Sequence, residues 1–301
     1  MHPSNKKQFV IAYLVKENEK MKKTIAMLTA MVMLMAMVLA GCGSSAAPAA
    51  STAPAAPAAS EAPAAEPTDL EYVKAKGTLV VGITDFAPMD YKDEAGNWIG
   101  FDADMAAAFA ESLGVAVEFV EIEWDNKVLE LNSKNIDCVW NGMTLTDEVK
   151  SAMTCSNAYC NNAQVVVVPA DKAADCQTVE SVAELNFAVE AGSAGEAEVN
   201  ALGYKCTPVL SQADALMEVA AGTSDAAVID ALMAAAMVGE GTSYANLTYT
   251  CGLNSEEYGV GFRTGSDLAD ALNAFFSAAY ADGSMQACAE LYKVQAAIIA
   301  Q

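Results

Sequence analysis

Short apolar runs alternate with amphipathic stretches from position 78 onward, and this alternation limits the choice of fold more than any other feature. The β-branched runs at 78–83 and 136–140 predict buried strands, and residues 115–124 alternate like a strand between them. Apolar residues recur every four positions over 105–113 before Gly114, which predicts an amphipathic helix that ends at the glycine. Strand–helix–strand units of this kind predict parallel strands with helical crossovers, and therefore an α/β fold.

The second half of the chain has a similar plan. Apolar runs predict strands at 164–168, 187–190, 226–229 and 258–262. Helical patterns begin near 196 and cover 213–221, 232–238, 268–281 and 285–291. Asp102 and Asp230 stand where the N-caps of two of the predicted helices are expected. The sequence thus predicts two α/β units of similar plan, without an internal sequence repeat.

Composition and charge exclude several classes of function. The 301 residues are enough for one large domain or two medium lobes, and the net charge of −23 opposes binding to nucleic acid phosphates. The one histidine, His2, lies at the extreme N-terminus, which excludes Ser-His-Asp and Cys-His catalysis and a histidine metal site in the folded part. No Cys-x-x-Cys spacing occurs, so no zinc site, and no cofactor, is expected.

The N-terminal region has the features of a targeting segment. Basic residues after Met21, an apolar run over 25–38 and small residues before Cys42 predict a secretory signal over 21–42. Residues 1–20 carry charges that do not fit a signal peptide, which indicates that Met21 is the true start. The Ala-, Pro- and Ser-rich stretch at 43–69 cannot bury a core and predicts an extended tether.

Seven cysteines follow Cys42, so at least one thiol is free or pairs outside the chain. They are Cys138, Cys155, Cys160, Cys176, Cys206, Cys251 and Cys288. Disulfides can form outside the cell, but the spacing leaves their pairing open.

Seven ordered motifs resemble the polar amino acid family of ABC transporter solute-binding proteins. They are Gly77–Gly82, Phe86–Pro88, Gly100–Asp104, Lys134–Asp137, Asn141–Thr146, Ser224–Asp230 and Tyr258–Phe262. The Leu-Ala-Gly-Cys sequence at 39–42 resembles a bacterial lipobox, which implies that Cys42 is lipidated. The order and spacing of the seven motifs together, over about 77–292, make the resemblance specific.

The resemblance implies a type II periplasmic-binding-protein-like fold with two lobes joined by two crossing hinge strands. Lobe 1 would comprise residues 70–162 and 253–301, and lobe 2 residues 163–252. A small molecule would be held between the lobes, and the closed form would dock on an ABC permease. The implied protein is a monomer that is lipid-anchored on the outer face of the cytoplasmic membrane and binds no nucleic acid.

Nine residues match, or lie next to, the family's ligand contacts. They are Phe86, Trp124, Asn141, Gly142, Thr144, Glu190, Ser193, Ala194 and Asp230. The resemblance implies that the two aromatic rings sandwich the ligand and that the Asn-Gly-x-Thr segment hydrogen-bonds its polar ends. It also implies that the amides around residue 193 favour an anion and that the aspartate pairs with the α-ammonium group.

Each of these matches also has a purely structural alternative. The aromatic residues can be core residues, and the Asn-Gly-x-Thr segment can be a strand-to-helix turn with Thr146 as N-cap. Gly192 and Gly195 can merely shape a turn, and Asp230 can cap the helix that follows it.

Two departures from the family pattern bear on the ligand. The family usually carries an arginine where this chain has Val149, and that arginine grips the ligand's α-carboxylate. Lys150 is adjacent but points about 100° away on a helix. Glu190 occupies a position that is often polar or basic, and Asp85 lies beside the first aromatic residue. The expected pocket therefore gains acids and loses its cation, which favours a basic amino acid, a derivative with a masked carboxylate or a small amine.

Two other functions remain open for this chain. One is an enzyme on the same scaffold, in which Glu190 or Asp230 acts as a general acid or base. The other is a ligand-sensing or adhesion lipoprotein that serves no importer. The expected function is ligand capture without catalysis.

Overall fold

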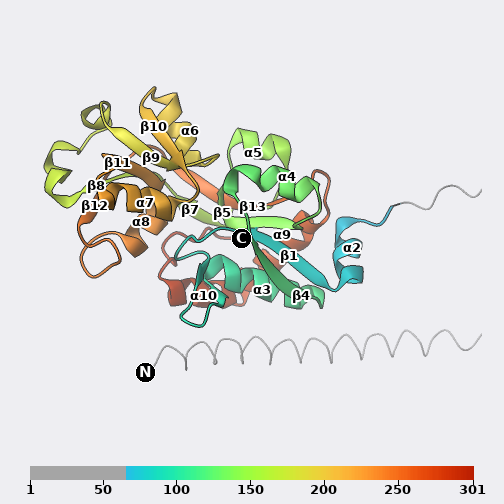
Figure 1. Ribbon diagram of the computed structural model, residues 1–301. Coiled ribbons are helices and arrows are strands. Elements are labelled where there is room, and N and C mark those ends of the chain that lie inside the picture. Colours follow the sequence, from blue (N-terminus) through green and yellow to red (C-terminus); the bar gives the residue numbers. More distant parts are fainter. Residues whose placement is uncertain (1–65) are drawn as a thin grey trace, which may run out of the picture. The chain divides into compact units, whose positions relative to one another are not determined.

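Two β-sheets flanked by helices make up the part of the chain that the computed structural model describes, residues 66–301 (Figure 1). The first sheet runs in the order β4 (Ala116–Glu121), β1 (Thr78–Ile83), β5 (Cys138–Thr144), β13 (Glu256–Phe262) and β6 (Thr154–Cys155), and β7 (Cys160–Asn162) also pairs with β13. Strands β4, β1 and β5 are parallel, whereas β13 is antiparallel to β5. The predicted start at Met21, the signal segment, Cys42 and most of the predicted tether lie outside the described residues.

Helices flank the first sheet and fix its loops. They are α2 (Asp69–Lys76), α3 (Phe101–Leu113), α4 (Lys127–Asn132), α5 (Asp147–Ala152), α9 (Leu268–Ala281) and α10 (Ser284–Tyr292), with a 3-10 turn at Trp124–Asn126 and a short hairpin of β2 (Tyr91–Lys92) and β3 (Trp98–Ile99). Helix α3 ends at Gly114, which adopts the left-handed conformation with φ of 77°, as its sequence predicts.

The second sheet runs in the order β10 (Lys205–Val209), β9 (Asn186–Glu190), β11 (Ala226–Asp230), β8 (Gln164–Pro169) and β12 (Leu247–Gly252). Its helices are α6 (Ala194–Ala201), α7 (Gln212–Ala221) and α8 (Ala231–Met237), and two further 3-10 segments lie at Ala170–Asp175 and Glu180–Val182. The chain passes between the sheets twice, at the β7–β8 and β12–β13 connections. The predicted two-lobed α/β architecture is confirmed, and we call the units built on the first and second sheets lobe 1 and lobe 2.

Asp102 does not cap helix α3, contrary to the expectation. Gly100 occupies the N-cap position with φ of 137°, and a Cβ atom there would lie 1.9 Å from the carbonyl oxygen of Met89, so only glycine fits. Asp102 is instead buried, and its Oδ2 accepts hydrogen bonds from the Gly142 amide at 2.7 Å and the Tyr159 hydroxyl at 2.7 Å. The side chain therefore ties helix α3 to the end of β5.

Helix α2, which the sequence analysis did not predict, is attached to lobe 1 by the one arginine of the chain. Arg263 donates from Nε to Asp69 at 3.0 Å, and its Nη2 lies 3.4 Å from Asp137. Asp137 also accepts from Lys76 at 2.6 Å and has no exposed surface. At the other end of the chain, Gln301 donates to the carbonyl of Ala158, another lobe 1 residue. Both ends of the described chain therefore belong to lobe 1.

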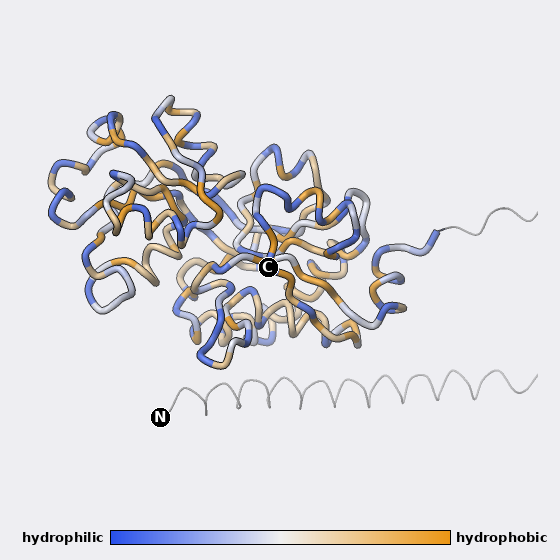
Figure 2. Tube along the Cα trace, in the orientation of Figure 1, coloured by the Kyte–Doolittle hydropathy of each residue, from blue (hydrophilic) through white to orange (hydrophobic). Residues whose placement is uncertain are grey.

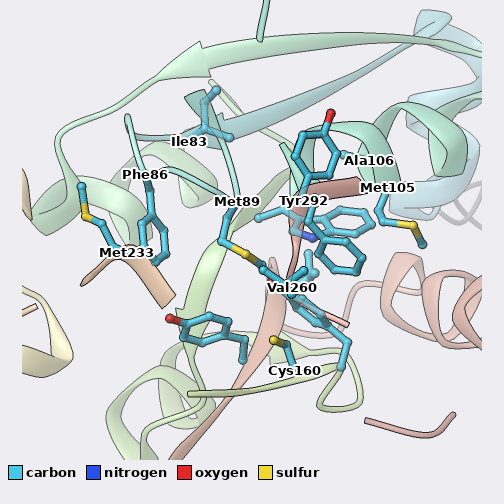
Figure 3. Close-up of a cluster of buried hydrophobic side chains, with 14 of the residues drawn as sticks. Ile83, Phe86, Met89, Met105, Ala106, Cys160, Met233, Val260 and Tyr292 are labelled. Atoms are coloured by element: carbon cyan, nitrogen blue, oxygen red, sulfur yellow. The ribbon is translucent and has the colours of Figure 1, made fainter. Parts of the chain in front are cut away.

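The apolar core extends from one lobe into the other. Figure 2 shows hydrophobic residues concentrated on the strands of both sheets and hydrophilic residues on the outer loops. One buried cluster joins Phe86 and Val260 of lobe 1 to Met233 of lobe 2, and Phe86 and Met233 lie side by side in Figure 3. Within residues 66–301, no helix combines the length and the apolar character needed to cross a membrane.

Candidate ligand-binding site

A cavity of about 460 Å³ lies between the lobes, which is within the usual range for a small-molecule site. Lobe 1 contributes the loop after β1, the 3-10 turn before α4, the end of β5 and helix α5. Lobe 2 contributes the ends of β9 and β11 and the starts of α6 and α7. All nine sequence-predicted residues line this cavity: Phe86, Trp124, Asn141, Gly142, Thr144, Glu190, Ser193, Ala194 and Asp230.

The two aromatic walls are buried and held by specific contacts. Phe86 is 3% exposed and meets Tyr258 edge-on, with ring centroids 6.3 Å apart. Gly142 lies against the Phe86 ring with φ of 57°, and a Cβ atom at this position would be 2.3 Å from Cε1 of the ring. Trp124 is 7% exposed and carries the Lys127 ammonium 4.9 Å from its ring centroid. Phe86 and Trp124 are therefore core residues that also face the cavity, so a role in the core and a role as walls for a ligand are compatible.

The polar groups at the end of β5 are largely paired within the protein. Asn141 exchanges hydrogen bonds with the amide and hydroxyl of Thr84 at 2.9 and 2.7 Å. Thr144 donates its hydroxyl to Glu256 at 2.9 Å. Thr146 caps helix α5 by accepting from the Val149 amide at 3.1 Å, as the structural alternative predicts. The segment 141–146 is therefore a strand-to-helix turn, stabilised by its own hydrogen bonds, that also borders the cavity.

The turn between β9 and α6 brings lobe 2 against lobe 1. Ser193 is the N-cap of α6 and accepts from the Glu196 amide at 3.1 Å, while Glu196 accepts from the Gly192 amide at 2.7 Å. A Cβ atom on Gly192 would lie 2.9 Å from the Cα of Asp125, which is in lobe 1. The two lobes are therefore in direct contact at the rim of the cavity.

Asp230 stands at the N-cap position of α8 but does not cap the helix with its side chain. It is 4% exposed, and it accepts from the Tyr258 hydroxyl at 2.6 Å and from the side-chain amide of Gln164 at 3.1 Å. The side-chain amides of Asn162 and Gln212 also donate to it. Burial and the charge of Glu256 raise the pKa of Asp230 to about 7, against the opposing effect of its hydrogen bonds.

Glu190 differs from Asp230 in having an unused acceptor. It ends strand β9, is 4% exposed, and its Oε1 has no hydrogen-bond partner among the described residues. Burial is the main cause that raises its pKa to about 8, and the charge of Asp230 adds to the effect. Two groups oppose the shift, a hydrogen bond from Gln212 and the charge of Lys127.

Lys127 is the residue of the site that the sequence analysis missed, and the expectation of a pocket without a cation was wrong. Its ammonium group donates to the carbonyl oxygens of Trp124 at 3.2 Å and Gly192 at 3.0 Å, so it joins the two lobes. Burial lowers its pKa despite the nearby acids. Val149 lines the cavity as expected, whereas Asp85 is exposed and does not.

Acidic side chains outnumber basic ones in the lining. Lys127 is the only basic side chain among the lining residues. The acidic side chains of the lining are Asp125, Glu148, Glu190, Glu196 and Asp230. The potential in a cleft of this kind favours positive ligands and opposes anions. The described residues contain no cluster of three metal-binding side chains, and their seven cysteines are free thiols.

Comparison with known proteins identifies the family. Residues 79–295 match the bacterial extracellular solute-binding proteins, family 3. The chain belongs to this family. The L-cystine-binding protein TcyJ of Escherichia coli K12 is 27% identical over 225 residues, which cover 73% of this chain and 84% of TcyJ.

Two solved structures of the same type are similar to the chain. A mutant of ArgBP from T. maritima has a TM-score of 0.70 and 32% identity, covering 75% of this chain and 99% of ArgBP. The ancestral amino acid-binding protein AncCDT-1, a precursor of cyclohexadienyl dehydratase, has a TM-score of 0.68 and 30% identity, covering 74% of this chain and 98% of its own. The chain is therefore a member of the amino-acid-binding group of extracellular solute-binding proteins.

Proposed function

We propose that this protein captures a cationic amino acid or a small amine between its lobes and delivers it to an ABC permease. The observation that carries the proposal is the excess of acids in the cavity lining, where Lys127 faces five carboxyl groups. Lys127 also donates two hydrogen bonds to carbonyl oxygens of the protein, so it is less available to a ligand carboxylate. ArgBP from T. maritima, at 32% identity, is a relative for which an arginine-bound structure is known, and arginine is a ligand of this class.

In the proposed complex, Phe86 and Trp124 form the walls on either side of the ligand. The ligand's uncharged or negative polar groups form hydrogen bonds with the backbone of the Asn141–Thr144 segment and with the amides of Ser193 and Ala194. The acids of lobe 2 receive the positive charge. No catalytic residue, cofactor or metal takes part in this function.

We further propose that the protein is a monomeric lipoprotein on the outer face of the cytoplasmic membrane. A signal at 21–42 and lipidation of Cys42 would anchor it, and residues 43–69 would tether the two lobes to the anchor. Lobe 1 would comprise 70–162 with 253–301, and lobe 2 would comprise 163–252. Metabolic labelling with a radioactive fatty acid tests the anchor, because Cys42→Ser should abolish the label.

A thermal-shift screen tests the ligand class. The panel contains the twenty amino acids, their amides and small biogenic amines. A ligand present at 100 times its dissociation constant adds about 2.7 kcal/mol to the stability of the folded state. The largest shifts should come from basic amino acids or amines. If glutamate or aspartate gives the largest shift, the proposed ligand class is wrong.

A second candidate function is an enzyme on the same scaffold, and one observation favours it. The carboxyl group of Glu190, with its pKa raised to about 8, holds a proton at neutral pH as a general acid must. Mass spectrometry of the ligand after prolonged incubation separates the two functions. A binding protein returns its ligand unchanged, whereas chemical conversion would establish the enzyme.

A further inference from the structure

We propose that Lys127 is a latch, a positioning residue of lobe 1 that raises ligand affinity by holding lobe 2 closed. The inference concerns the site of the proposed function and rests on that function for the positive charge of the ligand. The Lys127 ammonium group donates to the carbonyl oxygen of Trp124 in its own lobe at 3.2 Å and to that of Gly192 in lobe 2 at 3.0 Å. The second hydrogen bond crosses between the lobes, so it exists only while they are in contact.

The side chain of Lys127 is held in place by lobe 1. It is 8% exposed, and its ammonium group lies 4.9 Å from the centroid of the Trp124 ring, a distance at which a cation and an aromatic face attract each other. A lysine that is already fixed in this way loses little further side-chain entropy when the lobes meet. Its hydrogen bond to lobe 2 is also of the stronger kind, because the donor is charged.

Acids of both lobes surround the ammonium group of Lys127. Burial lowers its pKa, and the carboxyl groups of Asp125 and Glu148 in lobe 1 and of Glu190 and Glu196 in lobe 2 oppose that shift. Closure brings the carboxylates of the two lobes toward one another, and like charges that face each other across an interface are unfavourable. Lys127 is the only basic side chain among the described residues of the lining. It therefore both bridges the lobes and offsets the repulsion between them.

A latch and a purely electrostatic role predict opposite effects when the charge of Lys127 is removed. Lys127→Met keeps the length and the apolar stem of the side chain but removes the charge and the hydrogen bond between the lobes. If Lys127 merely repelled a positive ligand, its loss would strengthen the binding of a cation. As a latch, its loss should weaken the binding of L-arginine roughly 10- to 100-fold, because the closed form loses a hydrogen bond from a charged group.

Calorimetric titration of the full-length protein in mild detergent with L-arginine measures this change. Lys150→Met is the matched control, since Lys150 is also a lysine of lobe 1, on α5, but is exposed and is not among the lining residues. The control should bind arginine as wild type does. In stopped-flow tryptophan fluorescence, Lys127→Met should release arginine faster and bind it at a similar rate, because a latch acts after the encounter. Equal or tighter binding by Lys127→Met would overturn the inference.

Hydrogen–deuterium exchange of the same proteins without arginine gives a second readout. Every group of the latch belongs to the protein, so Lys127→Met should accelerate exchange in lobe 2 over residues 190–196. Strand β11, in the core of lobe 2, should stay protected, which separates loss of the latch from general unfolding. Unchanged exchange over 190–196 would also overturn the inference. If wild type binds neither arginine nor any other cation of the panel, the proposed function fails, and the exchange measurement alone decides whether Lys127 is a latch.

Discussion

Adding a single methyl group at Gly192 should weaken ligand binding without disturbing the folding of either lobe. Its Cβ, in a Gly192→Ala variant, would lie 2.7 Å from Oδ1 and 2.9 Å from Cα of Asp125 in lobe 1. Distances this short require the lobes to move apart, because one of the opposing atoms belongs to the backbone. The clash exists only while the lobes are in contact, so it opposes closure and leaves each lobe intact.

The free-energy cost of the Gly192→Ala substitution has two components that can be separated. Alanine in the left-handed conformation, here with φ of 70°, costs about 1 kcal/mol whether the lobes are open or closed. Overpacking by one methyl group adds about 1–3 kcal/mol in the closed form alone. Because only the second component distinguishes the closed from the open form, ligand affinity should fall roughly 5- to 150-fold.

The assay is calorimetric titration of the tightest ligand of the panel, with thermal melting in its absence. Gly203→Ala is the control, since Gly203 is also in lobe 2 and has φ of 74°, but its Cβ would meet no atom within 4 Å. Both variants should melt at similar temperatures without ligand, and only Gly192→Ala should lose affinity. Equal affinities in the two variants would show that the bound form does not bring Gly192 against Asp125.

Three further outcomes are expected. Burial raises the pKa of Asp102 and of Asp230 to about 7 from a model-peptide value of 3.8, so between these pH values the folded chain holds more protons than the unfolded chain. The ligand-free melting temperature should therefore fall as the pH rises from 4.5 to 7, and a rising profile would contradict this. Asp137→Ala should reduce the free energy of unfolding in urea by about 3–5 kcal/mol, since it leaves Lys76 without its carboxylate and leaves Arg263 with Asp69 alone; a loss below 1 kcal/mol would refute it. Gly142→Ala should displace the Phe86 ring and destabilise the protein by about 1–3 kcal/mol, and unchanged binding and stability would count against the close packing described.

The parts of the fold that local patterns specify could be predicted from the sequence. Helix α3 was predicted because its apolar spacing and the glycine after it are both short-range signals. Strand β1 was predicted from 78 to 83 for the same reason, since a β-branched run is buried wherever its neighbours lie. Helix α2 was missed, although Thr68 and Glu71 form a capping box that a closer examination of the sequence could have found.

The parts of the site that depend on distant residues could not be predicted. Asp102 looked like a helix cap, because its partners Gly142 and Tyr159 are brought to it only by the folded sheet. Lys127 could not be singled out from the sequence, because a lysine is rarely buried and its carbonyl partner on Gly192 is 65 residues away. The nine cavity residues were found through the family resemblance, which carries three-dimensional information that periodicity lacks.

The attachment of both ends of the described chain to lobe 1 has a mechanical consequence. Arg263 fastens helix α2 to lobe 1, and Gln301 is bound to the same lobe at the far end of the chain. Among the described residues, lobe 2 is thus an insertion whose backbone is joined to lobe 1 by the two hinge segments. A pulling force on the chain ahead of Thr68 is borne by lobe 1 and exerts no torque across the hinge. Tension in the upstream chain and the opening of the lobes are therefore mechanically independent.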